Sequence, residues 1–276
     1  MRKKSVSCNN IRTPKLVKKP NIKITKLGIV SHDYRHEEQN GYRDFSYHLK
    51  DILGCLDEQK CDSVLFSLCT IVPRPSFKTK RRLSSLRNIK SVFIEEFCDK
   101  GDDNRVPKRY VVYYKTSKGW QEYELHQQFG SLSKCKAKEI IELTNNVKKR
   151  KTFGKCAVLL CGESNIVKYS QQDRTCIDEY NYLNAVSGVS IFLNPIHDRM
   201  TRYEMKLKRI FLSENNKWVV SVWNKGKIHK DGKTRDGKDP AWTVYHNGSE
   251  LLIDRINCTI PSNSSIEIGI LDMREK

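Results

Sequence analysis

Cys161, Gly162 and Glu163 place a thiol and a carboxylate at the end of an apolar run, residues 156–160. Consecutive apolar residues favour a strand that is covered on both faces. Glycine lets the backbone turn sharply and approach another segment closely. Because open α/β sheets carry their chemistry at the carboxyl ends of strands, Cys161 is a candidate nucleophile. A free cysteine is also among the most buried residue types, so a core thiol is the competing interpretation.

His197 and Asp198 follow a second apolar run, residues 189–193. Neighbouring parallel strands end at the same edge of a sheet, so we expect His197 to lie near Cys161. A cysteine and a histidine with a carboxylate behind them are sufficient for acyl transfer. Glu163 and Glu124 are alternative groups for moving the proton. The competing interpretation of His197 and Asp198 is a polar surface loop.

The elements that would position these residues alternate between strands and helices. An amphipathic helix is predicted over residues 42–59, from apolar residues at helical spacing. It lies between predicted strands at 24–30 and 62–68, which gives a strand–helix–strand unit. Further helices are predicted at 135–145, 174–186 and 202–216, the last with Tyr203, Leu207, Ile210, Phe211 and Glu214 on one face. Further strands are predicted at 91–97, 109–115, 120–129, 156–160, 189–193, 218–223, 242–245, 250–254 and 265–273. The order predicts an α/β fold with mixed sheets.

The composition limits the class of protein. The chain has 276 residues, 38% of them hydrophobic, and a formal net charge of +19. We predict a basic arm at 1–23 and a single domain at 24–276. The ten cysteines form no Cys-x-x-Cys pair and no zinc-site spacing, so we expect reduced thiols and no metal or other cofactor. No apolar stretch follows the basic start and no run could span a bilayer, so a cytoplasmic protein is expected.

The positive charge favours an anionic partner, such as nucleic acid or a nucleic-acid enzyme. Two basic runs are candidate anion-binding sites, although solvated charge runs are common. The candidate residues are Lys78, Lys80, Arg81, Arg82, Lys148, Lys149 and Arg150.

The order of elements after residue 155 resembles the nitrilase, or carbon–nitrogen hydrolase, superfamily. Leu160-Cys161-Gly162-Glu163 is similar to the turn that carries the nucleophile of that family. The similarity extends, in order, to residues 189–195, 209–215, 219–224, 242–248 and 270–273. The resemblance implies a four-layer αββα sandwich with two mixed sheets, which usually dimerises through a helical face. It also implies a Glu–Lys–Cys triad that attacks amides or nitriles.

Two positions depart from the family pattern. Leu68 stands where the family has its Glu, and Leu125 stands where it has its Lys. Leucine beside a thiol would raise the thiol pKa by desolvation, which opposes nucleophilic attack. The resemblance also places Leu68, Leu125, Glu214 and Asn224 around the substrate pocket. For Glu214 and Asn224, a satisfied helix carboxylate and a turn cap are the competing interpretations.

Three hypotheses follow. The first is a non-catalytic nitrilase-like module that binds or scaffolds, with nucleic acid or a protein as partner and a homodimer as a candidate assembly. The alternative is an amide hydrolase in which Cys161 acts with a rewired base. The third is that the true Glu and Lys lie elsewhere in the chain.

Overall fold

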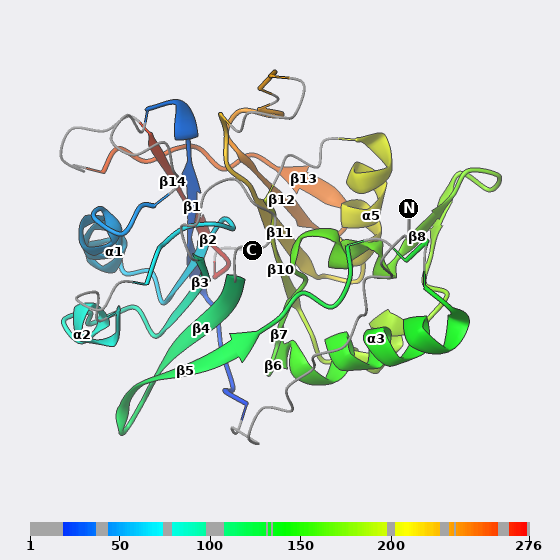
Figure 1. Ribbon diagram of the computed structural model, residues 1–276, viewed down its shortest axis with the longest axis horizontal. Helices are drawn as coiled ribbons and strands as arrows, with labels where there is room; N and C mark the ends of the chain where they lie inside the picture. The colour runs from blue at the N-terminus through cyan, green and yellow to red at the C-terminus, as the bar shows by residue number, and fades with distance from the viewer. Residues whose placement is uncertain are drawn as a thin grey trace, which may run out of the picture.

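The computed structural model describes residues 19–36, 44–73, 79–97, 108–130, 132–133, 135–197, 202–226, 232–234, 236–258 and 265–274. At its centre lie two six-stranded sheets, with helices on both outer sides (Figure 1). Most of the predicted basic arm, residues 1–18, lies outside the described residues, as do Lys78 and Asp198.

The first sheet has the strand order β14–β1–β2–β3–β4–β5. Its strands are β1 (Lys26–His32), β2 (Ser63–Phe66), β3 (Ser91–Phe97), β4 (Lys108–Thr116), β5 (Gly119–Leu125) and β14 (Ile266–Asp272). β1, β2 and β3 pair in parallel, whereas β14, β4 and β5 are antiparallel to their neighbours. Leu27 and Ile29 of β1 face the core between the sheets, and Val30 faces the outer side, as the twofold alternation of a strand requires.

The second sheet repeats this plan, with the order β13–β12–β11–β10–β7–β6. Its strands are β6 (Thr152–Phe153), β7 (Cys156–Val158), β10 (Ile191–Pro195), β11 (Trp218–Val222), β12 (Trp242–His246) and β13 (Ser249–Leu251). β7, β10 and β11 are parallel. Because Val158 pairs with Leu193, the ends of β7 and β10 lie side by side, as predicted.

Three of the four hydrophobic clusters in the described part of the chain lie between its four layers. One core lies between the sheets, and the other two lie between each sheet and its helices. The first sheet is covered by α1 (Leu49–Glu58) and α2 (Thr79–Leu83), and the second by α3 (Ala137–Arg150), α4 (Tyr182–Ala185) and α5 (Tyr203–Ser213). The predicted four-layer αββα sandwich with two mixed sheets is therefore confirmed.

The predicted apolar stripe of α1 is the face that packs on the first sheet. Phe45, Leu49, Ile52, Leu53 and Leu56 are all buried. A Cβ atom added at Gly28 of β1 would lie 2.7 Å from Leu56, so glycine allows this close approach. The helix itself begins later than predicted, at Leu49.

Two predictions of helical structure were wrong. Residues 174–186 do not form one helix, because β9 (Thr175–Ile177) pairs with β8 (Lys168–Ser170) and only α4 is helical. In α5 the buried face consists of Met205, Lys208, Arg209, Leu212 and Ser213. Hydrogen bonds from Lys208 to Asn165 and from Arg209 to Ser221 allow the two cations to be buried, and they turn Tyr203 to the outside.

The prediction that all ten cysteines are reduced was also wrong. A disulfide joins Cys55 of α1 to Cys258, with their Cα atoms 6.1 Å apart. This separation is within the ordinary range for the bond, and the spacing along the chain gave no sign of it. Among the described residues, no helix is both long enough and apolar enough to cross a membrane.

Candidate active site

Cys161 lies directly beyond β7, at the start of a short 3-10 helix, η2 (Cys161–Ile166). Its backbone has a φ of +46°, a left-handed conformation that is unusual for a residue with a side chain. Such strained positions cluster at functional sites. The thiol is only partly buried, whereas Cys156 at the start of the same strand is fully buried. The structure therefore turns Cys161 out of the strand, as the sequence predicted for a candidate nucleophile.

Gly162 makes this turn tight. A Cβ atom at position 162 would lie 2.3 Å from the carbonyl oxygen of Gly130 and 2.6 Å from its Cα. These are backbone atoms, so they cannot move aside as a side chain could. Glycine at 162 is therefore required by a close approach between two backbone segments, as predicted.

Glu163 fixes the same turn from inside. One carboxylate oxygen accepts hydrogen bonds from the backbone N–H of Gln128, at 2.6 Å, and from the Lys151 ammonium group. The other accepts from the backbone N–H of Leu160 at 2.8 Å. Both charged side chains are almost completely buried. Burial raises the pKa of Glu163, against the opposing effect of Lys151, and burial likewise lowers the pKa of Lys151. These contacts hold the turn that carries Cys161, and the role of Glu163 as one of the two alternative proton carriers stays a prediction.

His197 follows β10 and meets Cys161, as the parallel pairing predicts. Its imidazole lies close enough to the Cys161 thiol for each group to shift the pKa of the other. Its Nε2 lies 2.9 Å from Oε2 of Glu95. Asn194, on β10 itself, donates hydrogen bonds to the carbonyl oxygens of Leu159, at 2.6 Å, and Cys161, at 3.3 Å. β10 therefore positions both the imidazole and the backbone of the candidate nucleophile.

The electrostatics of these groups shift the pKa of Cys161 down and the pKa of His197 up. Burial opposes ionisation of Cys161, but hydrogen bonds and charge from His197, together with the backbone N–H of Gly162, leave the thiol pKa below its ordinary value. Burial would lower the pKa of His197, but the negative charge of Glu95 and the hydrogen bonds raise it well above its ordinary value. A thiolate is the nucleophilic form of cysteine, and a lower thiol pKa increases the fraction of it that is present.

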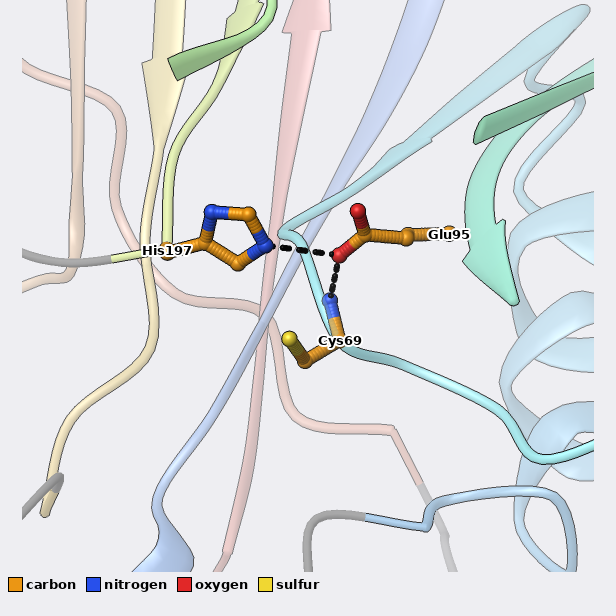
Figure 2. A group of neighbouring side chains, drawn as sticks. All are labelled: Cys69, Glu95 and His197. Carbon is orange, nitrogen blue, oxygen red and sulfur yellow. Dashed lines mark hydrogen bonds and ion pairs between the residues drawn. The ribbon is translucent and has the colours of Figure 1, made fainter. Parts of the chain in front are cut away.

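Glu95 and Cys69 were missed by the sequence analysis. Glu95 lies on β3 and Cys69 follows β2, so both come from the first sheet, whereas Cys161 and His197 come from the second. Figure 2 shows one carboxylate oxygen of Glu95 facing both the His197 ring and the backbone N–H of Cys69, 2.5 Å away. The sequence contained a signal for Glu95, because Glu95 and Glu96 interrupt an apolar run. The structure shows that both carboxylates are buried, which is rare for this residue type.

Leu68 and Leu125, which the resemblance aligns with the Glu and Lys of the nitrilase pattern, lie in an apolar environment. Leu68 and Leu125 are 1% and 2% exposed and belong to the core between the sheets. Glu124 lies on the other face of its strand, in an ion pair with Arg109 at 3.2 Å, and is partly exposed. Glu124 is therefore directed away from the core that contains its neighbour Leu125.

Asn224 and Glu214 differ in their surroundings. Asn224 is buried, accepts a hydrogen bond from the backbone N–H of His32 at 3.1 Å and donates one to the carbonyl oxygen of Leu68 at 2.8 Å. It therefore joins the ends of three strands, a structural role that the sequence analysis did not predict. Glu214 is exposed at the C-terminal end of α5.

The basic runs lie on helices of the two outer layers. Lys80, Arg81 and Arg82 belong to α2, and Lys148, Lys149 and Arg150 form the last turn of α3. Some of these cations have local partners: Lys80 pairs with Glu122 at 3.2 Å, and Lys148 donates to the carbonyl oxygen of Tyr180 at 2.9 Å. The two basic runs therefore lie on separate outer layers of the molecule.

No protein-family model matches the chain. No curated protein matches it either. Among solved structures, the chain is similar to a carbon–nitrogen hydrolase from Helicobacter pylori G27, with 13% identity, a TM-score of 0.48 and coverage of 92% of this chain and 91% of that one. It is also similar to a CN-hydrolase superfamily protein from Xanthomonas campestris, with 12% identity, a TM-score of 0.46 and 92% of each chain covered.

A third similar structure is a mutant amidase from Nesterenkonia sp. AN1, with 12% identity, a TM-score of 0.44 and coverage of 93% of this chain and 94% of that one. At these values the similarity carries no conclusion about activity, substrate or assembly.

Proposed function

We propose that this protein is a cysteine-dependent acyl-transfer enzyme that hydrolyses a carbon–nitrogen bond of the amide type, with Cys161 as its nucleophile. The observation that carries the proposal is the position of His197, whose ring lies 2.9 Å from the buried Glu95 carboxylate and close enough to Cys161 to lower the pKa of its thiol. Nucleophile, base and orienting carboxylate are the three roles that such chemistry needs.

In the proposed reaction, the Cys161 thiolate attacks the carbonyl carbon of the substrate and forms a carbon–sulfur bond. Collapse of the tetrahedral intermediate breaks the carbon–nitrogen bond, and His197 gives its proton to the leaving nitrogen. Water then attacks the thioester while His197 accepts a proton. This step releases the acid and restores the thiolate. Glu95 holds the imidazole ring in place throughout.

The proposal corresponds to the rewired hydrolase among the hypotheses drawn from the sequence, with one change. Glu95 takes the role that was predicted for Asp198. The class of bond comes from the resemblance of residues 160–163 to the nucleophile turn of the carbon–nitrogen hydrolases. The apolar Leu68 and Leu125 argue against the standard Glu–Lys–Cys mechanism.

Alkylation by iodoacetamide tests the activated thiol directly. The EDTA-treated protein is labelled at pH 7, quenched over time and analysed by peptide mass spectrometry. Cys135 and Cys176 are suitable internal references, because they are also partly buried free thiols. Cys161 is expected to react at least about tenfold faster than either reference, and His197→Gln is expected to remove this advantage. Equal rates in the wild-type protein would overturn the proposal.

Hydrolysis is tested on a panel of amides that release a chromophoric amine. Wild-type protein is expected to release the amine, and Cys161→Ala is expected to release none above the buffer rate. Circular dichroism and thermal unfolding of each variant separate loss of chemistry from loss of fold. If Cys161 is unreactive in a folded protein, the binding or scaffolding hypothesis replaces this one.

Binding to nucleic acid is a second candidate function, favoured by the net charge of +19 and by the basic last turn of α3. It is compatible with hydrolysis, since α3 lies on an outer layer and the Cys161 site lies between elements of the two sheets. The assembly of the protein stays a prediction, and multi-angle light scattering would distinguish a monomer from the predicted homodimer.

A further inference from the structure

Cys69, Glu95 and His197 form a compact group of three different ligand types (Figure 2). One sulfur, one carboxylate oxygen and one ring nitrogen lie within 4.8 Å of one another. Cys69 and Glu95 are only 4% and 5% exposed. The backbone of Cys69 has a φ of +54°, a left-handed conformation of the kind that clusters at functional sites.

This donor set matches the ligands that zinc prefers. Zn²⁺ takes thiolate, imidazole and carboxylate ligands at about 2.3, 2.1 and 2.1 Å in tetrahedral geometry. Those bond lengths place an N and an O ligand about 3.4 Å apart, and an S and an N ligand about 3.6 Å apart. His197 Nε2 and Glu95 Oε2 are 2.9 Å apart. Small side-chain rotations would therefore make room for the ion.

The chemistry of the donors separates zinc from other common cations. Mg²⁺ and Ca²⁺ take oxygen ligands, and only one of the three residues supplies oxygen. A thiolate and a carboxylate with a neutral imidazole carry two negative charges, which balance Zn²⁺ in a buried place. Three protein ligands also leave the fourth tetrahedral position for water.

We propose that Cys69, Glu95 and His197 bind one Zn²⁺ ion, with water as the fourth ligand. Binding displaces the protons from the Cys69 thiol and from His197 Nε2 and replaces the hydrogen bond between His197 and Glu95 by two bonds to the metal. The three residues lie on different elements, β3 and the segments after β2 and β10, so the ion would also join the two sheets.

A consequence for the chemistry of the site rests on the proposed function. An imidazole whose Nε2 is bonded to zinc no longer carries the proton that pairs with Glu95, and the carboxylate is engaged by the metal. Zinc and thiol catalysis would therefore exclude each other, and zinc would act as a reversible inhibitor. The binding of the ion itself does not depend on that function.

The metal alone is the probe. Full-length protein is treated with EDTA, freed of chelator and titrated with Zn²⁺ against a chromophoric chelator, and bound metal is counted by mass spectrometry. We expect one tight Zn²⁺ per chain. Co²⁺ in its place should give the charge-transfer absorption of a thiolate ligand. Cys69→Ser should weaken zinc binding by at least about 100-fold, because even an outer contact to a zinc ligand is worth 10- to 100-fold.

Cys135→Ser is the matched control, since Cys135 is a partly buried free thiol outside the group. It should bind zinc as the wild-type protein does. Zinc content below about one tenth per chain, or equal affinity in the Cys69→Ser and wild-type proteins with equal thermal stability, would overturn the site.

Cys161→Ala separates the two proposals. Cys161 is outside the three-residue group, so this variant should keep its zinc affinity while losing amide hydrolysis. Fast alkylation of Cys161 without zinc binding overturns only the metal site. Zinc binding that depends on Cys69, together with a slow Cys161, overturns only the proposed hydrolase.

Discussion

Lys151 and Glu163 form an ion pair that is shielded from solvent, with side-chain exposures of 1% and 0%. The pair joins the residue that follows α3 to the turn that carries Cys161. Two backbone N–H groups complete the coordination of the carboxylate, so the whole turn is built around one buried negative charge. This arrangement explains a carboxylate two residues after the nucleophile position without assigning it a part in proton transfer.

Removing one member of this pair should destabilise the protein strongly. Glu163→Ala leaves the Lys151 ammonium buried without its partner, and breaking a buried pair in this way typically costs about 3–5 kcal/mol. Urea unfolding at pH 7 measures the loss. Glu179→Ala is the control, because Glu179 pairs with Lys168 on the surface. Such exposed pairs contribute at most about 1 kcal/mol. Equal effects of the two substitutions would contradict the assignment.

Gly162→Ala should disturb the turn directly. The added methyl group would meet backbone atoms of Gly130, so one of the two segments must shift. We expect a loss of about 1–3 kcal/mol in the free energy of unfolding, as for other overpacked sites, and slower alkylation of Cys161. Gly188→Ala is the control, since nothing lies within 4 Å of a Cβ there. If Gly162→Ala labels at the wild-type rate, the turn does not position the thiol.

His32 should make the protein sensitive to acid. Burial lowers its pKa to about 3, with a smaller contribution from the charge of His48 that a hydrogen bond with Asn224 opposes. Below about pH 6.5 the imidazole of His32 binds a proton in the unfolded chain but not in the folded chain. The contribution of His32 to stability is therefore complete above that pH and is lost as the pH falls towards 3. The greatest slope is about 1.4 kcal/mol per pH unit.

Urea unfolding at pH 7, 6, 5 and 4 measures this slope. His32→Phe should flatten the profile, because it removes the imidazole that titrates. The phenyl ring can keep the stacking on Phe45, whose ring centroid lies 3.6 Å from that of His32. His126→Gln serves as the control, since His126 is exposed. A profile as steep in His32→Phe as in the wild-type protein would show that other groups cause the acid sensitivity.

The basic turn of α3 gives a prediction for nucleic-acid binding. Lys149→Glu with Arg150→Glu should weaken retention on immobilised DNA or RNA. It should also reduce the slope of log K against log salt by up to about 1.8, at about 0.9 for each phosphate contact. The control is the double variant Lys60→Glu with Lys118→Glu, which changes the net charge by the same amount at exposed residues outside α3. Equal losses in both variants would indicate an effect of net charge alone.

The sequence predicts the scaffold well because its strands are short apolar runs between turn residues. β3 and the parallel neighbours β7 and β10 lie where the apolar runs indicated. The segment 174–186 was harder, because Thr175, Cys176 and Ile177 become a strand only through pairing with β8. The buried face of α5 depends on partners in η2 and β11, which its own periodicity cannot reveal.

Only the part of the candidate site that belongs to the second sheet, Cys161 and His197, was predictable from the sequence. Cys161 and His197 follow adjacent parallel strands, so strand order alone brings them together. Glu95 is 102 residues from His197 and belongs to the other sheet. The spacing rules that reveal metal sites fail for the same reason, since Cys69, Glu95 and His197 share no local motif.

The division of the site between two sheets has a consequence for folding. Neither sheet alone contains a nucleophile with a complete base, because His197 and Cys161 reach Glu95 only when the sheets have docked. Contacts of such long sequence separation are slow to form. The reactivity of Cys161 should therefore appear late in refolding, after most secondary structure, and a time-resolved label at this single sulfur would report the moment at which the two halves of the molecule meet.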